Sequence, residues 1–459
     1  MDRLSELPDS VIFHIFWLLP MNEVVRTTIL SKRWLNLWTT TPFLNFDESK
    51  SDSQFSTTDK FRHFVHQALL CWDGVKVLKL KVVANYDESG GDVDLWVRFA
   101  KKYEVEELYL HSLMTDLSWT EEDHQVPWVP LYLYSCSSLK MLSIENCYFR
   151  IKGNVQWNQL KSLRIINCFG VTEDVINQIL RGSPQLEVLT MSFEWKAQSL
   201  CIRSTSLKEL SIYNDLYDDD EASTYRELSI WTPNLKALKI KGIPYNKCLL
   251  MNVSSLTHAT IEYSYVHWYN DEYCDKLSMN HIGDLFGQIL PSIQHVENVT
   301  LLSCCVKVLG AMIERCMNSS SPNVKSLRQR FHCSKFVGMI EISPLLKKLF
   351  IEVGECVPSY DYRDSLRTDS NVYLQLEKNL PMSFVLELRK VEVTLVEGDI
   401  LFPFLEFLLK NASKLEKIVF RVKRTMSPSH HSNSLRLASK RLLRMPRSSL
   451  AARFTFSEY

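Results

Sequence analysis

Glycine is scarce in this chain, with 13 glycines among 459 residues. No glycine-rich phosphate-binding loop and no Gly-x-Ser-x-Gly turn occurs, so the common nucleotide-binding and serine-hydrolase motifs are excluded. We therefore expect no catalytic residues and no cofactor. A site assembled from scattered residues leaves no motif, so an enzyme of that kind stays open as one alternative.

Cysteine pairs of the Cys-x-x-Cys type are also missing, although the chain has 12 cysteines. Most zinc and redox sites need such a pair, so we expect free thiols in a reducing compartment and no metal site. The start of the chain lacks the features of a secretory signal, and no run approaches the ~18 to 20 apolar residues that span a bilayer. These absences predict an intracellular protein, in the nucleus or the cytoplasm, that has no membrane partner.

Net charge is absent as well, because 53 lysines and arginines balance 53 aspartates and glutamates. The charge of the whole molecule therefore favours neither a nucleic-acid coat nor a membrane-surface role. Hydrophobic residues make up 46% of the chain and charged residues 23%, as in ordinary globular proteins. A chain of this length exceeds what one hydrophobic core usually organises, which predicts several domains or a repeat architecture.

The first forty residues predict three short helices. Pro8 suits the first turn of a helix that Pro20 ends. Asn22 and Ser31 are candidate caps for the second and third helices. Apolar residues lie on more than one side of these helices, and so small a domain cannot bury them all. A partner protein or the rest of this chain covers them, and the physical argument weighs the two equally.

The same segment resembles an F-box. The resemblance is carried by LSELPD at 4–9, IFWLLP at 15–20, VVRT at 24–27, LSKRWLNLW at 30–38 and the flank PFLNFD at 42–47. It implies binding to the Skp-type adaptor that links F-box proteins to a cullin, with Lys32 and Arg33 adding charge contacts at the rim. By resemblance, the adaptor-binding residues are Leu7, Pro8, Ile12, Ile15, Leu19, Val24, Val25, Ser31 and Trp34.

After this segment, residues 60–72 predict an amphipathic helix with an apolar stripe from Phe61 to Trp72. His63 and His66 lie off the stripe. No carboxylate or cysteine at helical spacing completes a ligand set, so we interpret them as solvated histidines.

An apolar triplet of the form L-x-x-L-x-[L/I] then recurs along the chain. Its first members lie at 75, 105, 139, 160, 186, 207 and 235, and weaker copies begin at 256, 296 and 346. From 139 to 256 the intervals are 21 to 28 residues, which fits the period of leucine-rich repeats, in which each repeat contributes one strand. The last two apolar residues of a triplet then face the core, and residues such as Arg164 and Lys239 project outward.

Two features between the predicted strands support this assignment of inward and outward residues. Cys147, Cys168 and Cys304 each lie eight residues after the first member of a triplet, where leucine-rich repeats place a turn, so we expect structural thiols. Residues 171–180 predict a return helix that ends before Gly182.

The pattern changes after residue 359 and resembles the FBD domain of plant-type F-box proteins. The resemblance is carried by LLKNA at 408–412, LEKI at 415–418 and PRSS at 446–449. We expect a small module of helices and strands that caps the last repeats, with Pro403 delaying the start of one helix. From Arg421 to Ser457 the chain has nine lysines and arginines and no acidic residue, but interleaved leucines favour an amphipathic helix over nucleic-acid binding.

Together these features predict an α/β protein made of a three-helix F-box, an irregular leucine-rich-repeat solenoid with parallel strands on one face and helices and turns on the other, and an α/β FBD module. The expected boundaries are 1–47 for the F-box, 48–72 for a linker and amphipathic helix, 73–358 for the repeats and 359–459 for the FBD module.

The resemblance implies a non-catalytic substrate receptor of a Skp–cullin–F-box ubiquitin ligase. Its F-box would bind the adaptor, and its repeats and FBD module would bind a protein substrate of unknown identity. The alternative is a scaffold without ligase function that binds protein or nucleic acid through the basic C-terminal region.

Overall fold

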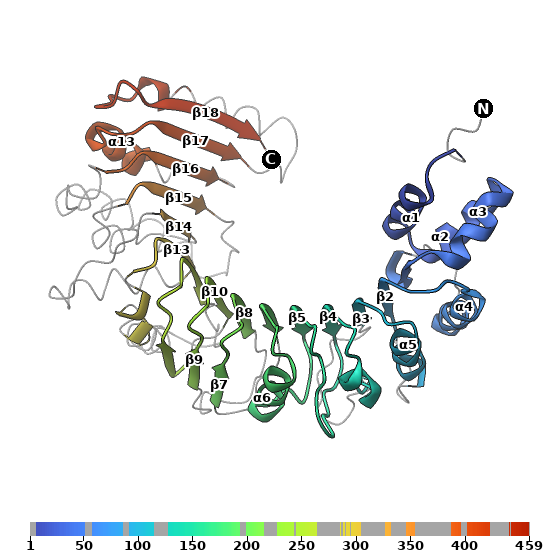
Figure 1. The fold of residues 1–459 in the computed structure, drawn as a ribbon. Coiled ribbons are helices and arrows are strands. Elements are labelled where there is room, and N and C mark those ends of the chain that lie inside the picture. The colour runs from blue at the N-terminus through green and yellow to red at the C-terminus, as the bar shows by residue number, and fades with distance from the viewer. Residues whose placement is uncertain are drawn as a thin grey trace. The chain divides into compact units, whose positions relative to one another are not determined.

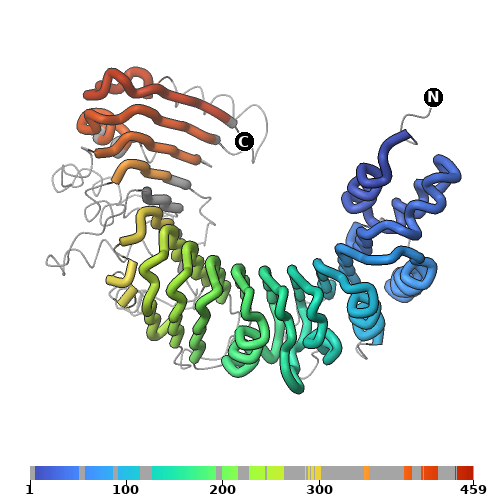
Figure 2. The backbone as a smooth tube through the Cα atoms, viewed as in Figure 1, coloured from blue at the N-terminus to red at the C-terminus, as the bar shows by residue number. Residues whose placement is uncertain are grey.

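The computed structural model describes residues 6–50, 57–85, 91–113, 127–192, 199–214, 227–242, 245–263, 285, 288–289, 291–293, 295–303, 326–331, 346–353, 387–395, 402–422, 440 and 442–458 (Figures 1 and 2). Internal contacts divide the chain into two units. The first comprises Met1–Thr224 with Ile230–Thr232, and the second comprises Tyr225–Ser229 with Pro233–Tyr459.

The first unit begins with the three expected helices. They are α1 (Asp9–Leu18), α2 (Met21–Arg26) and α3 (Lys32–Leu37), followed after α2 and α3 by the short 3-10 turns η1 (Thr27–Ile29) and η2 (Trp38–Thr40). Ser31 caps α3, because its hydroxyl accepts a hydrogen bond from the Trp34 N–H. Asn22 does not cap α2, contrary to the prediction. The Pro20 carbonyl accepts from the N–H groups of Glu23 and Val24, so the helix already starts at Met21.

A parallel sheet follows in the first unit. Its strands are β1 (Phe43–Asp47), β2 (Lys79–Ala84), β3 (Glu107–Ser112), β4 (Met141–Glu145), β5 (Ser162–Ile166), β6 (Val188–Ser192) and β8 (Glu209–Asn214), and each pairs in parallel with the next. Between them lie η3 (Glu48–Lys50), α4 (Thr58–Cys71), α5 (Gly91–Lys102), η4 (Leu131–Ser135), α6 (Glu173–Gly182) and β7 (Ser199–Arg203), with α5 and α6 on one side of the strands (Figure 1). A return element therefore separates most neighbouring strands, as in leucine-rich repeats, and β4 and β5 are joined without a helix or strand between them.

The core of this unit is a ladder of apolar residues at matching positions. Leu80, Leu108, Leu142, Leu163, Leu189 and Leu210 share one register position, and Val82, Leu110, Ile144, Ile165, Met191 and Ile212 share the next inward one. All of them are buried. The strand interpretation of the triplets is confirmed.

The phase predicted for the first triplet is wrong. Val75 is 97% exposed, and Val77, Leu80 and Val82 take the inward positions instead. The N–H groups of Leu78 and Lys79 both donate to the Pro42 carbonyl, at 2.8 and 3.1 Å, so β1 sets the register of β2 from a distance in sequence.

The return helix α6 includes Gly182, although we expected it to end earlier. A Cβ atom at Gly182 would collide with the carbonyl oxygen of Val155. Glycine is therefore needed for close packing between the last residue of α6 and the preceding loop.

The second unit continues the same architecture. Its parallel strands are β10 (Ala237–Gly242), β12 (His258–Tyr263), β13 (Asn298–Ser303), β14 (Ser326–Phe331), β15 (Lys348–Val353), β16 (Lys390–Leu395), β17 (Lys417–Val422) and β18 (Arg453–Glu458). The chain also contains β9 (Glu227–Trp231), β11 (Lys247–Met251) and the helix α13 (Phe402–Asn411).

The strands of the expected FBD module continue the parallel sheet of the second unit. Leu388, Val391 and Val393 repeat the buried triplet, and β15 to β18 pair in parallel without a change of direction. Helix α13 starts at Phe402, so Pro403 does not delay it and lies in its first turn, where its missing N–H costs nothing. Among the helices in the described parts of the chain, none is long and apolar enough to cross a membrane.

Candidate functional site

The three N-terminal helices share a small apolar core. Phe16 contacts Trp34 edge to face, with ring centroids 5.5 Å apart. Ile12, Val24 and Trp34, three of the residues expected to bind an adaptor, are almost completely buried in this core. A partner could reach them only by opening the helices.

The other six expected residues retain accessible surface. Pro8 is exposed, and the remaining five, which are Leu7, Ile15, Leu19, Val25 and Ser31, are half-buried. Ser31 also caps α3, so part of its role is structural. The resemblance therefore mixed core residues with surface residues.

Several exposed apolar residues of the helices, among them Val11 and Leu18, were missing from the expected set. Val11, the expected Ile15 and Leu18 follow one another at spacings of four and three, which places them on one stripe of α1. Leu18 is 70% exposed, and Ile29 is 91% exposed at the end of η1. Leu30 and Leu35 are exposed near α3. Projection of residues 9–18 onto a helical wheel separates this stripe from Ile12 and Phe16, so a signal was present in the sequence.

Arg33, which we expected at the rim of an interface, makes contacts within the protein. Its Nη2 donates to the backbone carbonyl of Leu7 at 2.8 Å, and the same guanidinium pairs with Asp9. It therefore holds the first turn of α1 against α3.

The helices are joined to the first repeats by direct contacts. The indole of Trp17 packs against the rings of Phe43 and Tyr109, at 6.2 and 6.3 Å between centroids, and the Lys79 ammonium lies 5.3 Å from its centre. Asn45 Nδ2 donates to the carbonyl of Leu19 at 3.2 Å. The side of α1 that faces the sheet is thus already occupied, whereas Val11 and Leu18 of the stripe are 43% and 70% exposed.

A second junction lies at the end of α4, where Trp72 Nε1 donates to the Thr41 carbonyl at 2.8 Å inside the protein. The apolar stripe predicted for this helix is confirmed, since Phe61, Val65, Ala68 and Trp72 are buried. His66 is not simply solvated, because its Nε2 lies 3.0 Å from Asp92 Oδ1 of α5. No group of three or more metal-ligating side chains occurs within the described ranges.

The outward face of β3 and β4 carries a polar cluster. His111 Nε2 is 3.0 Å from Ser143 Oγ, and His111 Nδ1 is 3.5 Å from Glu145 Oε2. Burial first, and then the charges of Lys81 and Arg164, lower the pKa of His111 to about 4, against the opposing charge of Asp47. His111 is therefore neutral near pH 7.

Serine, histidine and glutamate in this order are the groups of a hydrolytic triad. Two features oppose a nucleophilic role here. Ser143 is only 3% exposed, and the strand N–H groups around it are engaged in the parallel ladder, which leaves no pair of donors for an oxyanion. The cluster is a polar network that fixes side chains on the outward face.

The buried cysteines lie at the turns that follow the strands. Asn146 and Asn167 adopt left-handed backbone conformations, with φ of 55° and 49°, immediately before Cys147 and Cys168. Burial raises the pKa of the Cys168 thiol to about 12 and that of Cys147 well above its usual range. Both are structural thiols, as expected, whereas Cys304 lies outside the described residues.

Two family models match the chain. A model described as "F-box domain" covers residues 4–46, and one described as "FBD-associated F-box protein At5g56370, LRR repeats" covers residues 93–258.

Relatives from Arabidopsis thaliana match over longer stretches. F-box/LRR-repeat protein At3g03360 is 26% identical over 444 residues, covering 92% of this chain and 84% of the relative. F-box/LRR-repeat protein At3g26922 is 29% identical over 265 residues, covering 57% and 82%. F-box/FBD/LRR-repeat protein At5g56420 is 27% identical over 277 residues, covering 58% and 61%.

The fold and the matched models define a protein with an F-box followed by parallel repeats. The chain is similar to plant F-box/leucine-rich-repeat proteins, with an F-box match at its start and a match to FBD-associated repeats over residues 93–258.

Proposed function

We propose that this protein is a substrate receptor of a Skp–cullin–F-box ubiquitin ligase. The observation that carries the proposal is the apolar stripe on α1, with Leu18 70% exposed, on a helix whose other sides are occupied by its own core and by the first strands. Exposed apolar surface of this kind is typical of a protein interface. A Skp-type adaptor is the partner that the F-box implies, and through it a cullin.

Within this proposal the expected adaptor-binding residues divide into two groups. Leu7, Pro8, Ile15, Leu19, Val25 and Ser31 would contact the adaptor together with Val11, Leu18 and Ile29. The buried residues Ile12, Val24 and Trp34 would act indirectly, by holding the helices in place.

In the receptor role this chain binds the substrate, and other subunits of the ligase carry out the chemistry. Holding a substrate beside a charged ubiquitin carrier raises the effective concentration of the two reacting groups, and no catalytic side chain is required of the receptor. We place the protein in the nucleus or the cytoplasm on the same basis. The boundaries at 47, 72 and 358 remain part of the proposal, with β1 pairing to β2 across the first of them.

A binding experiment with a purified Skp-type adaptor tests the proposal. Leu18→Asp with Ile29→Asp places charges on the exposed apolar surface, and we expect capture of the adaptor to be lost, since central interface residues often contribute ~2 kcal/mol or more each. The matched control is Leu70→Asp with Val75→Asp. These residues are 77% and 97% exposed and lie outside the F-box helices.

The control variant should capture the adaptor like the unaltered chain. If the unaltered chain fails to capture the adaptor, or if both double variants bind equally well, the receptor proposal is wrong. A chain that retains a protein or nucleic-acid partner without the adaptor would be a scaffold instead.

A further inference from the structure

Basic side chains occupy one register position of neighbouring strands in the second unit. Lys348 lies opposite Lys390, Lys390 opposite Lys417, and Lys417 opposite Arg453. Strands in a sheet are about 4.8 Å apart, so the four α-carbons fall within about 15 Å. We call these four residues the basic row.

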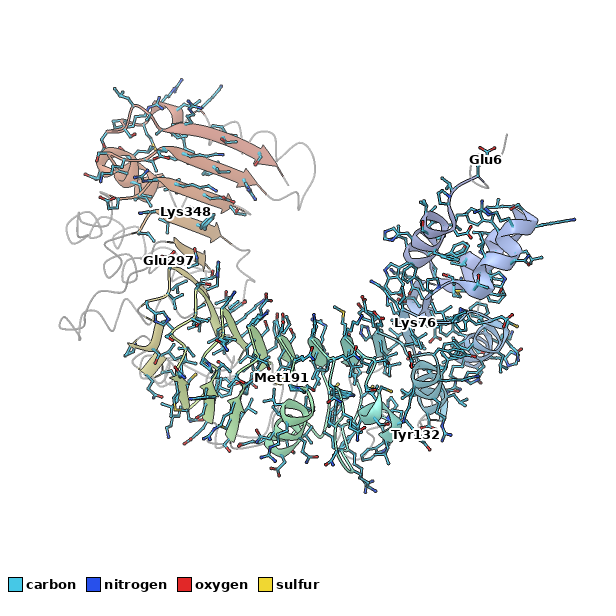
Figure 3. The ribbon with its side chains drawn as sticks, viewed as in Figure 1. Glu6, Lys76, Tyr132, Met191, Glu297 and Lys348 are labelled. Atoms are coloured by element: carbon cyan, nitrogen blue, oxygen red, sulfur yellow. The ribbon has the colours of Figure 1, made fainter. Side chains whose placement is uncertain are left out.

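The basic row faces solvent. Residues next to it in the chain, Leu349, Val391 and Ile418, are buried, and side chains alternate between the two faces of a strand. Three residues of the row are exposed, and Lys390 is half-buried. Figure 3 labels Lys348 on its strand, β15.

Internal carboxylates neutralise only a part of this charge. Glu392 is almost fully buried and serves two cations, with Lys390 Nζ at 3.0 Å and Arg421 Nη2 at 3.1 Å. Within the described ranges, Lys348, Lys417 and Arg453 form no ion pair and no side-chain hydrogen bond. Like charges at directly opposed positions destabilise a sheet, so a row of this kind is unfavourable unless an anion lies over it.

The surroundings of the row favour a short acidic peptide over a nucleic acid. Binding of single-stranded nucleic acid relies on aromatic side chains free to stack on bases. Phe350 lies two residues after Lys348 on the same face of β15, and the ammonium of Lys390 covers its ring at 5.2 Å from the ring centre.

An extended peptide fits the spacing. Side chains on one face of an extended segment recur about every 6.6 to 7 Å, and flexible lysine side chains on strands about 4.8 Å apart can reach them. We propose that the basic row binds an extended acidic segment of a protein partner through its carboxylates. The identification of that partner as a ubiquitination substrate rests on the proposed function.

Fluorescence anisotropy with the full-length chain tests the inference. The probe is a labelled peptide of alternating glutamate and serine, and the same peptide with glutamine in place of glutamate is the neutral control. The triple variant Lys348→Gln, Lys417→Gln, Arg453→Gln should lose about tenfold in affinity, since it removes three of the four cations that would pair with the peptide carboxylates. Binding should weaken further as salt rises to ~0.15 M.

A matched variant distinguishes the effect of losing the basic row from the effect of losing three positive charges elsewhere. Lys152→Gln, Lys161→Gln, Lys236→Gln also removes three exposed cations, none of which forms an ion pair within the described residues. This control should bind the acidic peptide like the unaltered chain. Equal loss in both triple variants, or no binding of the acidic peptide at low salt, overturns the inference.

Two further measurements distinguish the remaining outcomes. A poly-thymidine oligonucleotide that binds more tightly than the acidic peptide and displaces it would overturn the peptide assignment in favour of nucleic acid. Capture of the adaptor should be unchanged in the row variant, because the row lies outside the F-box. Failure of adaptor capture by the unaltered chain, with peptide binding intact, would remove the proposed function and leave the basic row as a peptide site.

Discussion

The guanidinium of Arg33 donates to the backbone carbonyl of Leu7 at 2.8 Å and so joins two segments that lie 26 residues apart. The same guanidinium pairs with Asp9, so Arg33 holds the entry to α1 against α3.

Arg33→Ala should therefore loosen the entry to α1. We expect hydrogen exchange at residues 11 and 12 to accelerate by about fivefold, which corresponds to about 1 kcal/mol for one partly exposed, charge-assisted bond. The control is Arg26→Ala, whose ion pair with Glu23 is exposed and lies within one helix. Equal acceleration in both variants would contradict the role given to Arg33.

Asn146 should tolerate glycine better than alanine. Its φ of 55° costs an alanine roughly 1 to 2 kcal/mol, and either substitution removes the hydrogen bond from Asn146 Nδ2 to the Ser112 carbonyl at 2.6 Å. Thermal unfolding should give the order of stability wild type, Asn146→Gly, Asn146→Ala. An alanine variant as stable as the glycine variant would show that the left-handed turn carries no strain.

His111 should make the first unit less stable in mild acid. Its pKa of about 4 in the folded protein lies below the ordinary 6.5, so the unfolded chain binds the proton more tightly. The stability contribution is complete above pH 6.5 and is lost as the pH falls toward 4, by about 2 kcal/mol at pH 5.

Urea unfolding at pH 7 and pH 5 checks this dependence. His111→Gln should lose less stability between the two values than the wild type, because glutamine does not titrate. His63→Gln, which replaces an exposed histidine, should behave like the wild type. The same pH response in all three proteins would refute the assignment to His111.

The cysteines should differ in their reaction with iodoacetamide at pH 8. Cys71 is exposed and should be alkylated in the native protein, whereas Cys147, Cys168 and Cys248 are buried thiols with raised pKa values and should be protected. All should react in urea. Peptide mass spectrometry reads the sites directly, and fast native labelling of Cys168 would disagree with the packing of its turn.

Local pattern was enough to predict much of the fold. Apolar residues two apart, as in Leu142 and Ile144, must face the same side of a strand, and their recurrence at a repeat period implies stacking. The triplets from Val105 to Leu256 were predicted in the correct phase for this reason. The capping role of Ser31 follows from equally local chemistry.

The features that the sequence alone did not predict depend on contacts between residues far apart in the chain. The register of β2 depends on the carbonyl of Pro42, and the role of Arg33 depends on Leu7. The interval from Leu388 to Leu415 lies within the repeat period of about 20 to 29 residues. The sequence therefore indicated that β16 and β17 continue the repeats, but the FBD resemblance led to a different interpretation. At the F-box, a family pattern identifies residues by type and does not distinguish buried Ile12 from exposed Leu18.

The contacts of Trp17, Asn45 and Trp72 hold the F-box helices directly against the first strands. If the protein acts as a receptor, a part of the substrate that lies against the first strands would be held in one fixed orientation to the ligase. The lysine that receives ubiquitin would then be selected by reach and angle and not by its sequence context. Trp72→Ala, which loosens this junction, would shift modification to other lysines of the same partner while leaving its affinity unchanged.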